Sequence, residues 1–526
     1  MIGCVVLGIL IGYNYSKRNG LTENELKLNT ILNLISQEYV DDSVKINDLT
    51  ESVIPLFLTG LDPHSSYLSP QENTSEQEEL KGNTTSIGVS VQVMNDTIKI
   101  IEVIPGGPSD KAGIKAGDKI VSIDDSLWTG PQVNVYKVND RLRGPRGSNV
   151  KLGIVRAGAE KQLSFVVTRG NAPKNTVDCY YMVDKTTGYV KVSQFGKTTY
   201  TEFVKALNYL QNNGAKRFII DLRGNGGGLF ETAKDMANEF LPRDNIIVST
   251  KGRHRRDEVT YRSDGNGNFQ DQELVVLIDE YSASASEIFA GAIQDNDRGL
   301  IIGRRSFGKG LVQSQHVFSD NSALILTTAK YYTPSGRCIQ RPYNNDRDAY
   351  QKEILDRKDN GELYNKNNIK RDKSQVYQTT TGRKVYGGGG IEPDIFVPCD
   401  TASESIYYKA VVNYGLIQEY SLKYATEHRA SLSKMSDYKQ LLRNLPANDE
   451  ILNDFVKYAA YKGVPDRWYY IHQSQDLITS NIKGYIARDI LGQGAYYPIV
   501  NRTDKTIEAA LKALNKHKAA FPITNY

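Results

Sequence analysis

The stretch Leu274-Val-Val-Leu-Ile-Asp-Glu-Tyr-Ser-Ala-Ser284-Ala-Ser-Glu287 joins an apolar run to a turn of small residues. An uninterrupted apolar run such as Leu274–Ile278 is typical of a strand that is buried on both faces. The small residues that follow predict a turn and the start of a helix, with Ser284 at the junction. A serine hydroxyl held at a strand-to-helix junction is a candidate nucleophile for acyl chemistry.

A serine hydroxyl is a weak nucleophile and needs a base to take its proton. None of the six histidines lies in the sequence context of a catalytic triad (His64, His254, His316, His428, His472 and His517). The segment Phe307-Gly-Lys309-Gly-Leu-Val-Gln313 offers a lysine instead, between two glycines that let the backbone approach closely. Burial disfavours the charged ammonium, so it can lower the pKa of a lysine from about 10.4 by several units. Gln313, four residues further along a predicted strand, keeps the same facing and can orient the amine.

These two segments resemble those of the carboxyl-terminal processing proteases, also called tail-specific proteases. The resemblance rests on Ser-Ala-Ser284-Ala-Ser-Glu, on Phe-Gly-Lys309-Gly-x-x-Gln313 and on the separation of 25 residues between the serine and the lysine. It selects Ser284 as nucleophile over Ser282 and Ser286, and it implies Lys309 as general base with Gln313 as its positioner. Either segment alone fits a helix start or a surface lysine, whereas the pair favours an enzyme.

A glycine-rich turn supplies a candidate oxyanion hole. Phe218–Arg223 has the pattern of a buried strand, and Gly224-Asn-Gly-Gly-Gly228 follows it. Backbone N–H groups exposed by such a turn suit a developing oxyanion. We therefore expect Gly227 or Gly228 to donate together with Ala285. A phosphate-binding turn is the alternative, and the run lacks the residue order of the known phosphate and dinucleotide motifs.

The composition limits the other classes of function. A chain of 526 residues is long enough for three or four domains. The net charge of +4 is small and the basic residues are spread along the chain, so we expect no nucleic-acid partner. The four cysteines match no zinc spacing and are too sparse for a disulfide framework. A serine–lysine mechanism needs no metal or organic cofactor, and none is predicted.

The first residues suggest export. Met1–Tyr13 is apolar and uncharged, and Lys17 and Arg18 follow. The run is shorter than the roughly 20 residues of a spanning helix, and it lacks the basic start of a signal peptide. We interpret residues 1–20 as a truncated signal anchor or membrane segment. This predicts a protein of the periplasm or cell envelope that an N-terminal segment can anchor to the membrane.

Between this segment and the catalytic motifs, the sequence predicts two regions. Residues 21–83 show helical spacing and form an N-terminal helical region, and residues 84–170 alternate short strands with turns. The second pattern resembles a PDZ domain. Such domains accept a peptide as an added strand on an exposed sheet edge and hold its terminal carboxylate by backbone N–H groups. The resemblance assigns the peptide-binding loop to Ile87, Gly88 and Val89.

Residues 171–400 alternate strands and helices, which predicts a layered α/β core. The family resemblance implies a crotonase-like protease core, with the PDZ domain preceding it and a closing strand near Gly387–Asp394. Residues 343–384 are polar and charged, and we interpret them as an inserted mobile lid. Residues 401–526 have apolar positions at helical spacing and predict a C-terminal helical domain, whose tyrosines fit a packed core or a homodimer face.

The sequence thus predicts a multidomain α/β serine endopeptidase with a Ser284/Lys309 dyad. It would capture unstructured protein C-termini through the PDZ domain and cleave the captured chain through an acyl-enzyme. The main alternative is a catalytically silent PDZ scaffold of the cell envelope. A crotonase-type acyl-thioester enzyme is a further alternative, which predicts coenzyme A binding and leaves the PDZ domain without a role.

Overall fold

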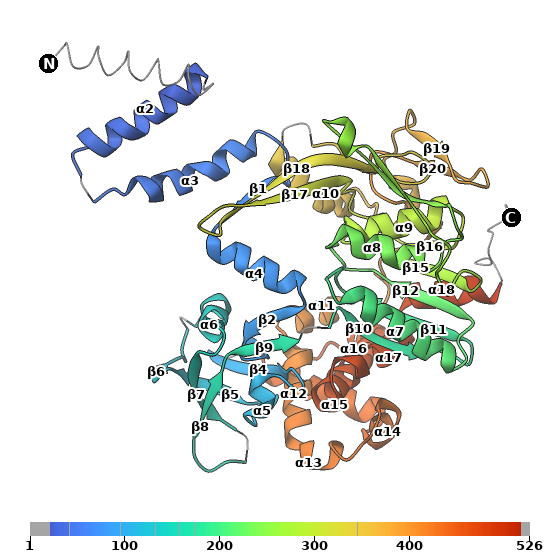
Figure 1. The fold of residues 1–526 in the computed structure, drawn as a ribbon. Helices are drawn as coiled ribbons and strands as arrows, with labels where there is room; N and C mark the ends of the chain where they lie inside the picture. Colours follow the sequence, from blue (N-terminus) through green and yellow to red (C-terminus); the bar gives the residue numbers. More distant parts are fainter. Residues whose placement is uncertain are drawn as a thin grey trace. The chain divides into compact units, whose positions relative to one another are not determined.

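The computed structural model describes residues 22–516 except 42, 95, 132, 157, 174 and 344–345 (Figure 1). The predicted signal anchor over residues 1–20 lies outside this part. The described chain forms two compact units, one of residues up to Pro70 with Gln313–Thr327 and Tyr343–Asp348, the other of the remainder. Across the described residues, the helices are all too short or too polar to span a bilayer.

The first unit holds two helices and a small sheet. Helices α2 (Glu23–Glu38) and α3 (Ile46–Thr59) precede strand β1 (Ser66–Leu68), as the predicted N-terminal helical region requires. Strand β1 pairs antiparallel with the first part of β18 (Ala323–Tyr332), and β17 (Leu311–Val317) is the other neighbour of β18.

The second unit is built on a six-stranded sheet. Its strands follow the order β10-β11-β12-β15-β16-β21, and all pairs are parallel except β10 with β11. Their bounds are β10 Val177–Met182, β11 Thr187–Val192, β12 Arg217–Asp221, β15 Glu273–Ile278, β16 Leu300–Gly303 and β21 Ile395–Phe396. The predicted closing strand therefore begins just after Asp394.

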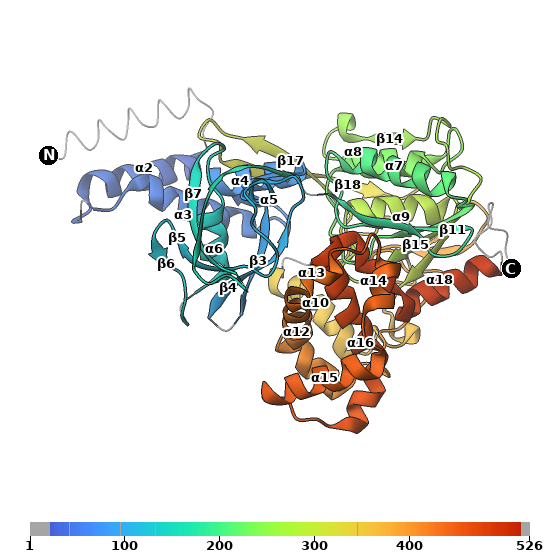
Figure 2. The same cartoon turned by 90° about the horizontal axis from the view of Figure 1, so that it is seen from below.

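Helices cover both faces of this sheet (Figure 2). Helices α7 (Thr199–Asn212), α8 (Phe230–Asn238) and α9 (Ala285–Asp295) lie on one face, and α18 (Lys505–Asn515) lies on the other. Side chains alternate along each strand, so Val276 packs with the first group and its neighbours Val275 and Leu277 pack with α18. Burial on both faces explains why β15 is a continuous apolar run.

A smaller antiparallel group adjoins the core. Strand β13 (Ile246–Gly252) pairs with β14 (Val259–Arg262) and with the last residues of β18, and β19 (Val376–Gln378) pairs with β20 (Lys384–Tyr386).

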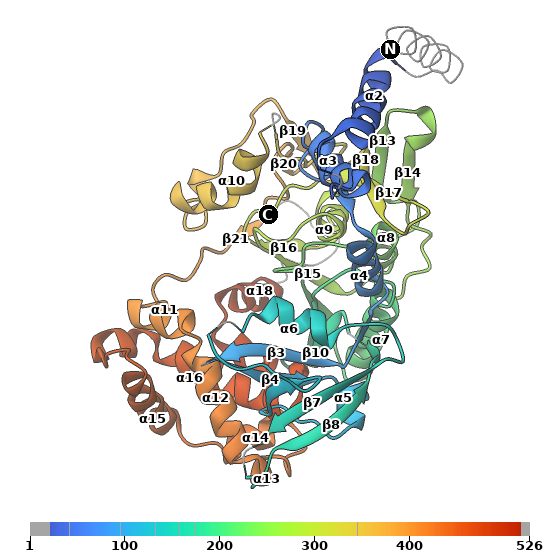
Figure 3. The same cartoon turned by 90° about the vertical axis from the view of Figure 1, so that its left-hand side faces the viewer.

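The PDZ region is a six-stranded antiparallel sheet with two helices. The order is β3-β4-β5-β7-β8, with the short β6 beside β5. The elements are β3 Val89–Met94, β4 Thr97–Val103, α5 Pro108–Lys111, β5 Lys119–Ile123, β6 Ser126–Leu127, α6 Val135–Leu142, β7 Asn149–Val155 and β8 Leu163–Thr168. Strand β3 is the edge of this sheet, and α6 lies beside it (Figure 3). Helix α4 (Pro70–Leu80) and the strand pair β2 (Asn83–Ser86) and β9 (Gly170–Pro173) flank the region in sequence.

The C-terminal segment is helical, as predicted. Its helices enclose a core of their own around the long α16, which contributes Ile471, Ile478, Ile482 and Ile486. They are α11 Ile406–Asn413, α12 Leu416–Glu427, α13 Arg429–Leu432, α14 Tyr438–Asn444, α15 Asn448–Tyr461, α16 Trp468–Leu491 and α17 Tyr497–Val500. Helix α18 follows and belongs to the core of the central sheet instead.

The charged insertion contains an anchored helix where the composition suggested a lid without structure. Helix α10 (Arg347–Asp359) buries Arg357, whose guanidinium donates to the carbonyls of Ser306 at 2.7 Å and Phe307 at 3.1 Å. Glu353 accepts from the same guanidinium at 2.7 Å. These bonds fasten the helix beneath the segment that leads to Lys309.

Candidate active site

Ser284 occupies a strained turn between β15 and α9. Its backbone angles are φ 54° and ψ −113°, a region that side chains other than glycine rarely adopt. A serine on a sharp strand-to-helix turn has its hydroxyl lifted out of the sheet, and such strain is typical of functional sites. The predicted nucleophile therefore sits in the backbone geometry that a nucleophile uses.

The carboxylate of Glu287 binds the backbone on both sides of the site. Oε2 accepts from the amide of Ser284 at 2.9 Å and from the amide of Lys309 at 2.8 Å. Oε1 accepts from the amide of Gly308 at 2.7 Å and from the hydroxyl of Ser306. The side chain is fully buried, and burial raises the pKa of Glu287. One buried group thus fixes the distance between the two segments named by the sequence.

Tyr331 makes a second link between the same two residues. Its hydroxyl lies 2.6 Å from the carbonyl oxygen of Lys309, to which it donates, and 3.2 Å from that of Ser284. Burial raises the pKa of Tyr331, so the hydroxyl keeps its proton. Amides and carbonyls of both residues are therefore held by shared partners.

The glycines around Lys309 allow close packing. Gly308 has φ +92°, and a Cβ added there would lie 3.1 Å from the amide nitrogen of Gly390. A Cβ at Gly310 would lie 2.8 Å from the amide nitrogen of Gln340. On α4, Glu76 is within electrostatic range of the Lys309 ammonium: burial raises the pKa of Glu76 and the lysine partly opposes that rise.

The glycine turn lies directly against the nucleophile. A Cβ added at Gly227, where φ is +108°, would meet the Cβ of Ser284 at 2.8 Å and the amide nitrogen of Ala285 at 3.0 Å. The amide of Gly227 already donates to Asn225 Oδ1 at 2.9 Å. Within the part of the chain that the structure describes, the amides of Gly228 and Ala285 have no hydrogen-bond acceptor. Two N–H groups near Ser284 are thus available to a ligand.

Asn225 connects the glycine turn to the nucleophile turn. Its carbonyl accepts from the amide of Ala283 at 3.0 Å and from the hydroxyl of Ser286 at 2.8 Å, and its side chain donates to the carbonyl of Val192 at 3.0 Å. The serine that flanks Ser284 on the helix side therefore has a structural contact.

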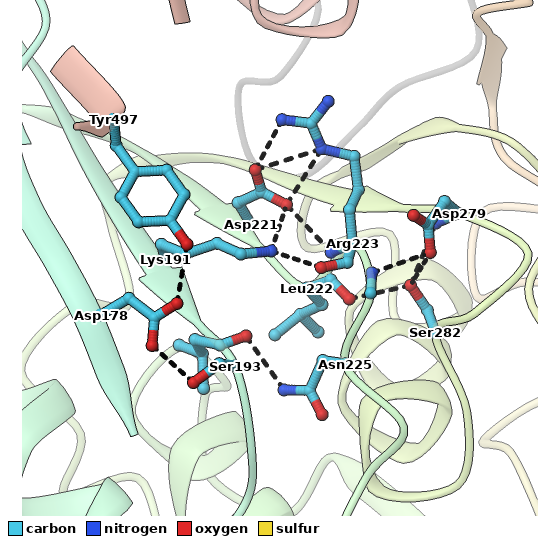
Figure 4. Close-up of polar contacts among 12 residues, drawn as sticks. Asp178, Lys191, Ser193, Asp221, Leu222, Arg223, Asn225, Asp279, Ser282 and Tyr497 are labelled. Carbon is cyan, nitrogen blue, oxygen red and sulfur yellow. Dashed lines mark hydrogen bonds and ion pairs between the residues drawn. The ribbon is translucent and has the colours of Figure 1, made fainter. Parts of the chain in front are cut away.

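A second set of bonds joins the two turns at their bases (Figure 4). Asp279 Oδ1 accepts from the amide of Gly224 at 2.9 Å, and the hydroxyl of Ser282 donates to the carbonyl of Leu222 at 2.9 Å. Burial raises the pKa of Asp279. Ser282, the other serine that flanks Ser284, is fully buried and committed to this contact.

Gln313 belongs to the first unit. Its side-chain amide donates to Thr327 Oγ1 at 3.4 Å, and Thr327 Oγ1 donates to Asp62 Oδ1 at 3.1 Å. Asp62 also accepts from the amides of His64 and Ser65, at 2.8 and 2.9 Å. The role predicted for Gln313 stays a prediction.

Two residues of the predicted peptide-binding loop, Ile87 and Val89, line a groove. Ile87 is fully buried in the PDZ core, and Gly88 has φ +75°. A cavity of about 530 Å³ runs along the edge strand β3 from this loop. One side is formed by Ile87, Val89, Ser90 and Val91, and the side from α6 by Asn139, Leu142 and Arg143.

Two residues that shape the site were not assigned a role from sequence. Glu287 stands three positions after Ser284, the spacing of a helix capping box, and that pattern gave a signal for it. Tyr331 had no local signal because its partners come from two distant segments. The described residues contain no group of three or more His, Cys, Asp or Glu side chains that could hold a metal ion.

Comparisons with known proteins identify the family of this chain. Residues 186–346 match the model of peptidase family S41, residues 77–155 match that of the PDZ domain, and residues 407–492 match a family of unknown function. A carboxy-terminal-processing protease of Bartonella bacilliformis is 38% identical over 296 residues, which cover 56% of this chain and 67% of that protein. A carboxyl-terminal-processing protease of Synechocystis sp. is 32% identical over 318 residues, covering 59% and 72%.

Among solved structures, the photosystem II D1 C-terminal processing protease is 25% identical, with a TM-score of 0.37 over 73% of this chain and 95% of that one. The sequence relatives and the family models are the stronger matches. The chain belongs to the carboxyl-terminal-processing proteases of peptidase family S41, and it is a serine peptidase with a PDZ domain.

Proposed function

We propose that the chain is an endopeptidase in which Ser284 is the nucleophile and Lys309 the general base. The observation that carries this proposal is the shared binding of both backbones by Glu287 and Tyr331, at a serine with a strained positive φ. Gln313 is proposed to orient the lysine amine, on the strength of the sequence motif alone.

For the oxyanion hole, we propose the amides of Gly228 and Ala285. Gly227 is the weaker choice because Asn225 already accepts from its amide. Donors fixed in place before the reaction stabilise the developing negative charge without reorganising, and one such donor contributes roughly 3 kcal/mol to transition-state stabilisation.

The reaction then has two halves. Ser284 Oγ attacks the carbonyl carbon of the peptide bond while its proton passes to the amine of Lys309, which must be unprotonated to accept it. The oxyanion collapses, the C–N bond breaks, and Lys309 returns the proton to the leaving amine. Water next attacks the acyl-enzyme while Lys309 takes a proton from it. The C–O bond to Ser284 then breaks, Lys309 returns the proton to Ser284 Oγ, and the product acid is released.

The PDZ groove is proposed to capture unstructured protein C-termini. Strand β3 is a sheet edge, so an incoming tail can pair with it as an added strand. The amides of Ile87 and Val89 suit the terminal carboxylate, whereas the amide of Gly88 donates to Ser86 Oγ at 3.1 Å. Arg143 supplies a positive charge to the groove, whose lining also contains Glu102 and Asp178. Ile87, Val89, Val91 and Leu142 give the groove apolar lining, which favours a tail with an apolar C-terminus.

Hydrolysis of a disordered protein with an apolar C-terminus tests the proposal. Wild type should yield fragments by mass spectrometry, and Ser284→Ala and Lys309→Ala should yield none. Lys330→Ala, at an exposed lysine of β18, is the matched control and should cleave normally. Cleavage by Ser284→Ala would refute the mechanism, and a wild type that binds the tail without cutting it would support the silent scaffold.

Export to the periplasm or cell envelope and homodimer formation are further proposals. The dimer proposal gains support from exposed apolar side chains on α2 and α3, which a partner surface would cover (Leu28, Ile31, Leu34, Leu56 and Phe57). Cell fractionation tests the first proposal. Mass photometry of wild type and Phe57→Glu tests the second, with a monomeric wild type as the contrary result.

A further inference from the structure

We propose that Asp504, at the start of α18, is a positioning residue for the glycine turn and acts through Arg223. The inference rests on the proposed function, because it takes the turn to hold the oxyanion donor. Asp504 lies outside the three segments that match known families.

Arg223, the last residue before the turn, makes hydrogen bonds through its amide, its carbonyl and its guanidinium (Figure 4). Its amide donates to Asp221 Oδ1 at 2.9 Å, and its guanidinium donates to Asp221 Oδ2 at 2.7 Å. Lys191 donates to the carbonyl of Arg223 and lies 3.4 Å from Asp221 Oδ1. Burial alone would raise the pKa of Asp221, but Arg223 and Lys191 hold it well below its usual range, so this carboxylate is ionised.

The remaining arm of Arg223 reaches the C-terminal helix. Nη1 donates to Asp504 Oδ2 at 2.7 Å. Asp504 uses its other oxygen to cap α18, where Oδ1 accepts from the amides of Thr506 at 2.7 Å and Ile507 at 3.2 Å. One carboxylate therefore fixes the helix start and the arginine together.

The turn after Arg223 depends on such anchors. Gly224, Gly227 and Gly228 all have positive φ (70°, 108° and 139°), and glycines supply no side chain to lock these angles. The amide of Gly228 is five residues beyond the arginine. The amide of Gly224 donates to Asp279 Oδ1, and Phe195 bonds with Gly227 and Leu229 on either side of Gly228. Arg223 holds the strand end from which this segment starts, so a shift of Arg223 changes the direction in which the Gly228 amide points towards the oxyanion.

The far end of helix α18 is bonded to strand β12, the strand that leads to Arg223, and this contact provides a matched control. Arg217, at the start of β12, donates from Nη2 to Asn515 Oδ1 at 2.8 Å. Arg223 follows the other end of β12, next to the glycine turn. Loosening the helix at Asn515 affects its docking without touching the turn.

The test compares Asp504→Asn with Asn515→Ala in the full chain. Asparagine keeps an oxygen for the helix cap but turns its NH₂ group towards Arg223, so donor faces donor. We expect kcat of Asp504→Asn to fall about tenfold with KM within about twofold, since small displacements of catalytic groups cost up to about a hundredfold. Asn515→Ala should keep the wild-type kcat.

A second readout separates positioning from folding. A peptide aldehyde forms a hemiacetal with the catalytic serine and places an oxyanion in the hole, so its Ki should rise by the same factor as kcat falls. The affinity of an uncleaved peptide, measured in the Ser284→Ala background, should not change when Asp504→Asn is added.

Three results would overturn the inference: an unchanged kcat in Asp504→Asn, an equal loss in Asn515→Ala, or a loss that disappears when kcat is expressed per folded enzyme. Each is distinct from failure of the proposed function. That failure would appear as hydrolysis by Ser284→Ala itself, whatever Asp504→Asn does.

Discussion

The amides of Ser284 and Lys309, 25 positions apart in the chain, donate to the same oxygen of a buried carboxylate. Because both bonds end on Glu287 Oε2, the two nitrogens lie within two hydrogen-bond lengths of each other. This carboxylate therefore holds the nucleophile turn and the lysine segment together.

Replacing Glu287 by glutamine should separate them. The new NH₂ group would meet N–H or O–H donors where the carboxylate accepted, leaving two buried donors unsatisfied at about 1–3 kcal/mol each. We expect a loss of roughly 3 kcal/mol in the free energy of unfolding, measured in urea, and loss of hydrolysis. Glu231→Gln, at an exposed position of α8, should behave as wild type. A stable and active Glu287→Gln enzyme would contradict the role given to this carboxylate.

Tyr331→Phe removes the second link and keeps the ring. One hydrogen bond to a carbonyl contributes about 1 kcal/mol, so the variant should fold with a slightly lower Tm. We expect kcat to fall about tenfold with little change in KM, because the alignment of Ser284 and Lys309 is lost while the substrate contacts stay. The neighbouring Tyr332→Phe is the control. Equal rates for the two variants would show that the hydroxyl of Tyr331 is dispensable.

The backbone strain at Ser284 predicts an unusual order of stability. At most positions glycine is less stable than alanine by roughly 0.5–1 kcal/mol, because it has more freedom in the unfolded chain. At φ 54° the order should reverse, with Ser284→Gly about 1 kcal/mol more stable than Ser284→Ala. Thermal unfolding of the two inactive variants measures the difference, and the ordinary order would mean that the turn relaxes without cost.

Asp489 on α16 should make stability depend on pH. It is buried, Arg488 lies 3.1 Å from its Oδ1, and burial raises the pKa of Asp489 to about 6. A folded-state pKa above the unfolded value gives stability that is full below about pH 4 and is lost as the pH rises through 6. The free energy of unfolding of Asp489→Asn, relative to that of wild type, should therefore rise by about 3 kcal/mol between pH 4 and pH 7. Melting curves across this pH range measure the effect, and Asp476→Asn, at an exposed position, is the control. A stability difference between wild type and Asp489→Asn that does not change with pH would refute the claim.

Much of the core was predictable because its signals are local. Five apolar residues in a row identified β15 as a doubly buried strand, and the small residues after it located Ser284 at the start of α9. The edge strand of the PDZ domain likewise followed from short-range alternation and turn residues, whereas helix α6 beside it was not predicted.

What the sequence did not reveal depends on contacts between distant segments. Tyr331 acts on two loops that meet only in the folded chain. The sequence also did not show that the N–H of Gly228 is available and that of Gly227 is not, because this depends on the side chain of Asn225, which accepts from Gly227. Charged residues in the insertion suggested a solvated lid, yet Arg357 is buried against backbone carbonyls.

The bond between Arg223 and Asp504 spans 281 positions, and it bears on the order in which the enzyme is made. Ribosomes deliver a chain from its N-terminus, so nucleophile, lysine and glycine turn all emerge before the carboxylate that steadies them. A partly synthesised chain therefore contains Ser284, Lys309 and the glycine turn but still lacks Asp504. The glycine turn therefore gains its contact with α18 only after the whole catalytic segment has been made.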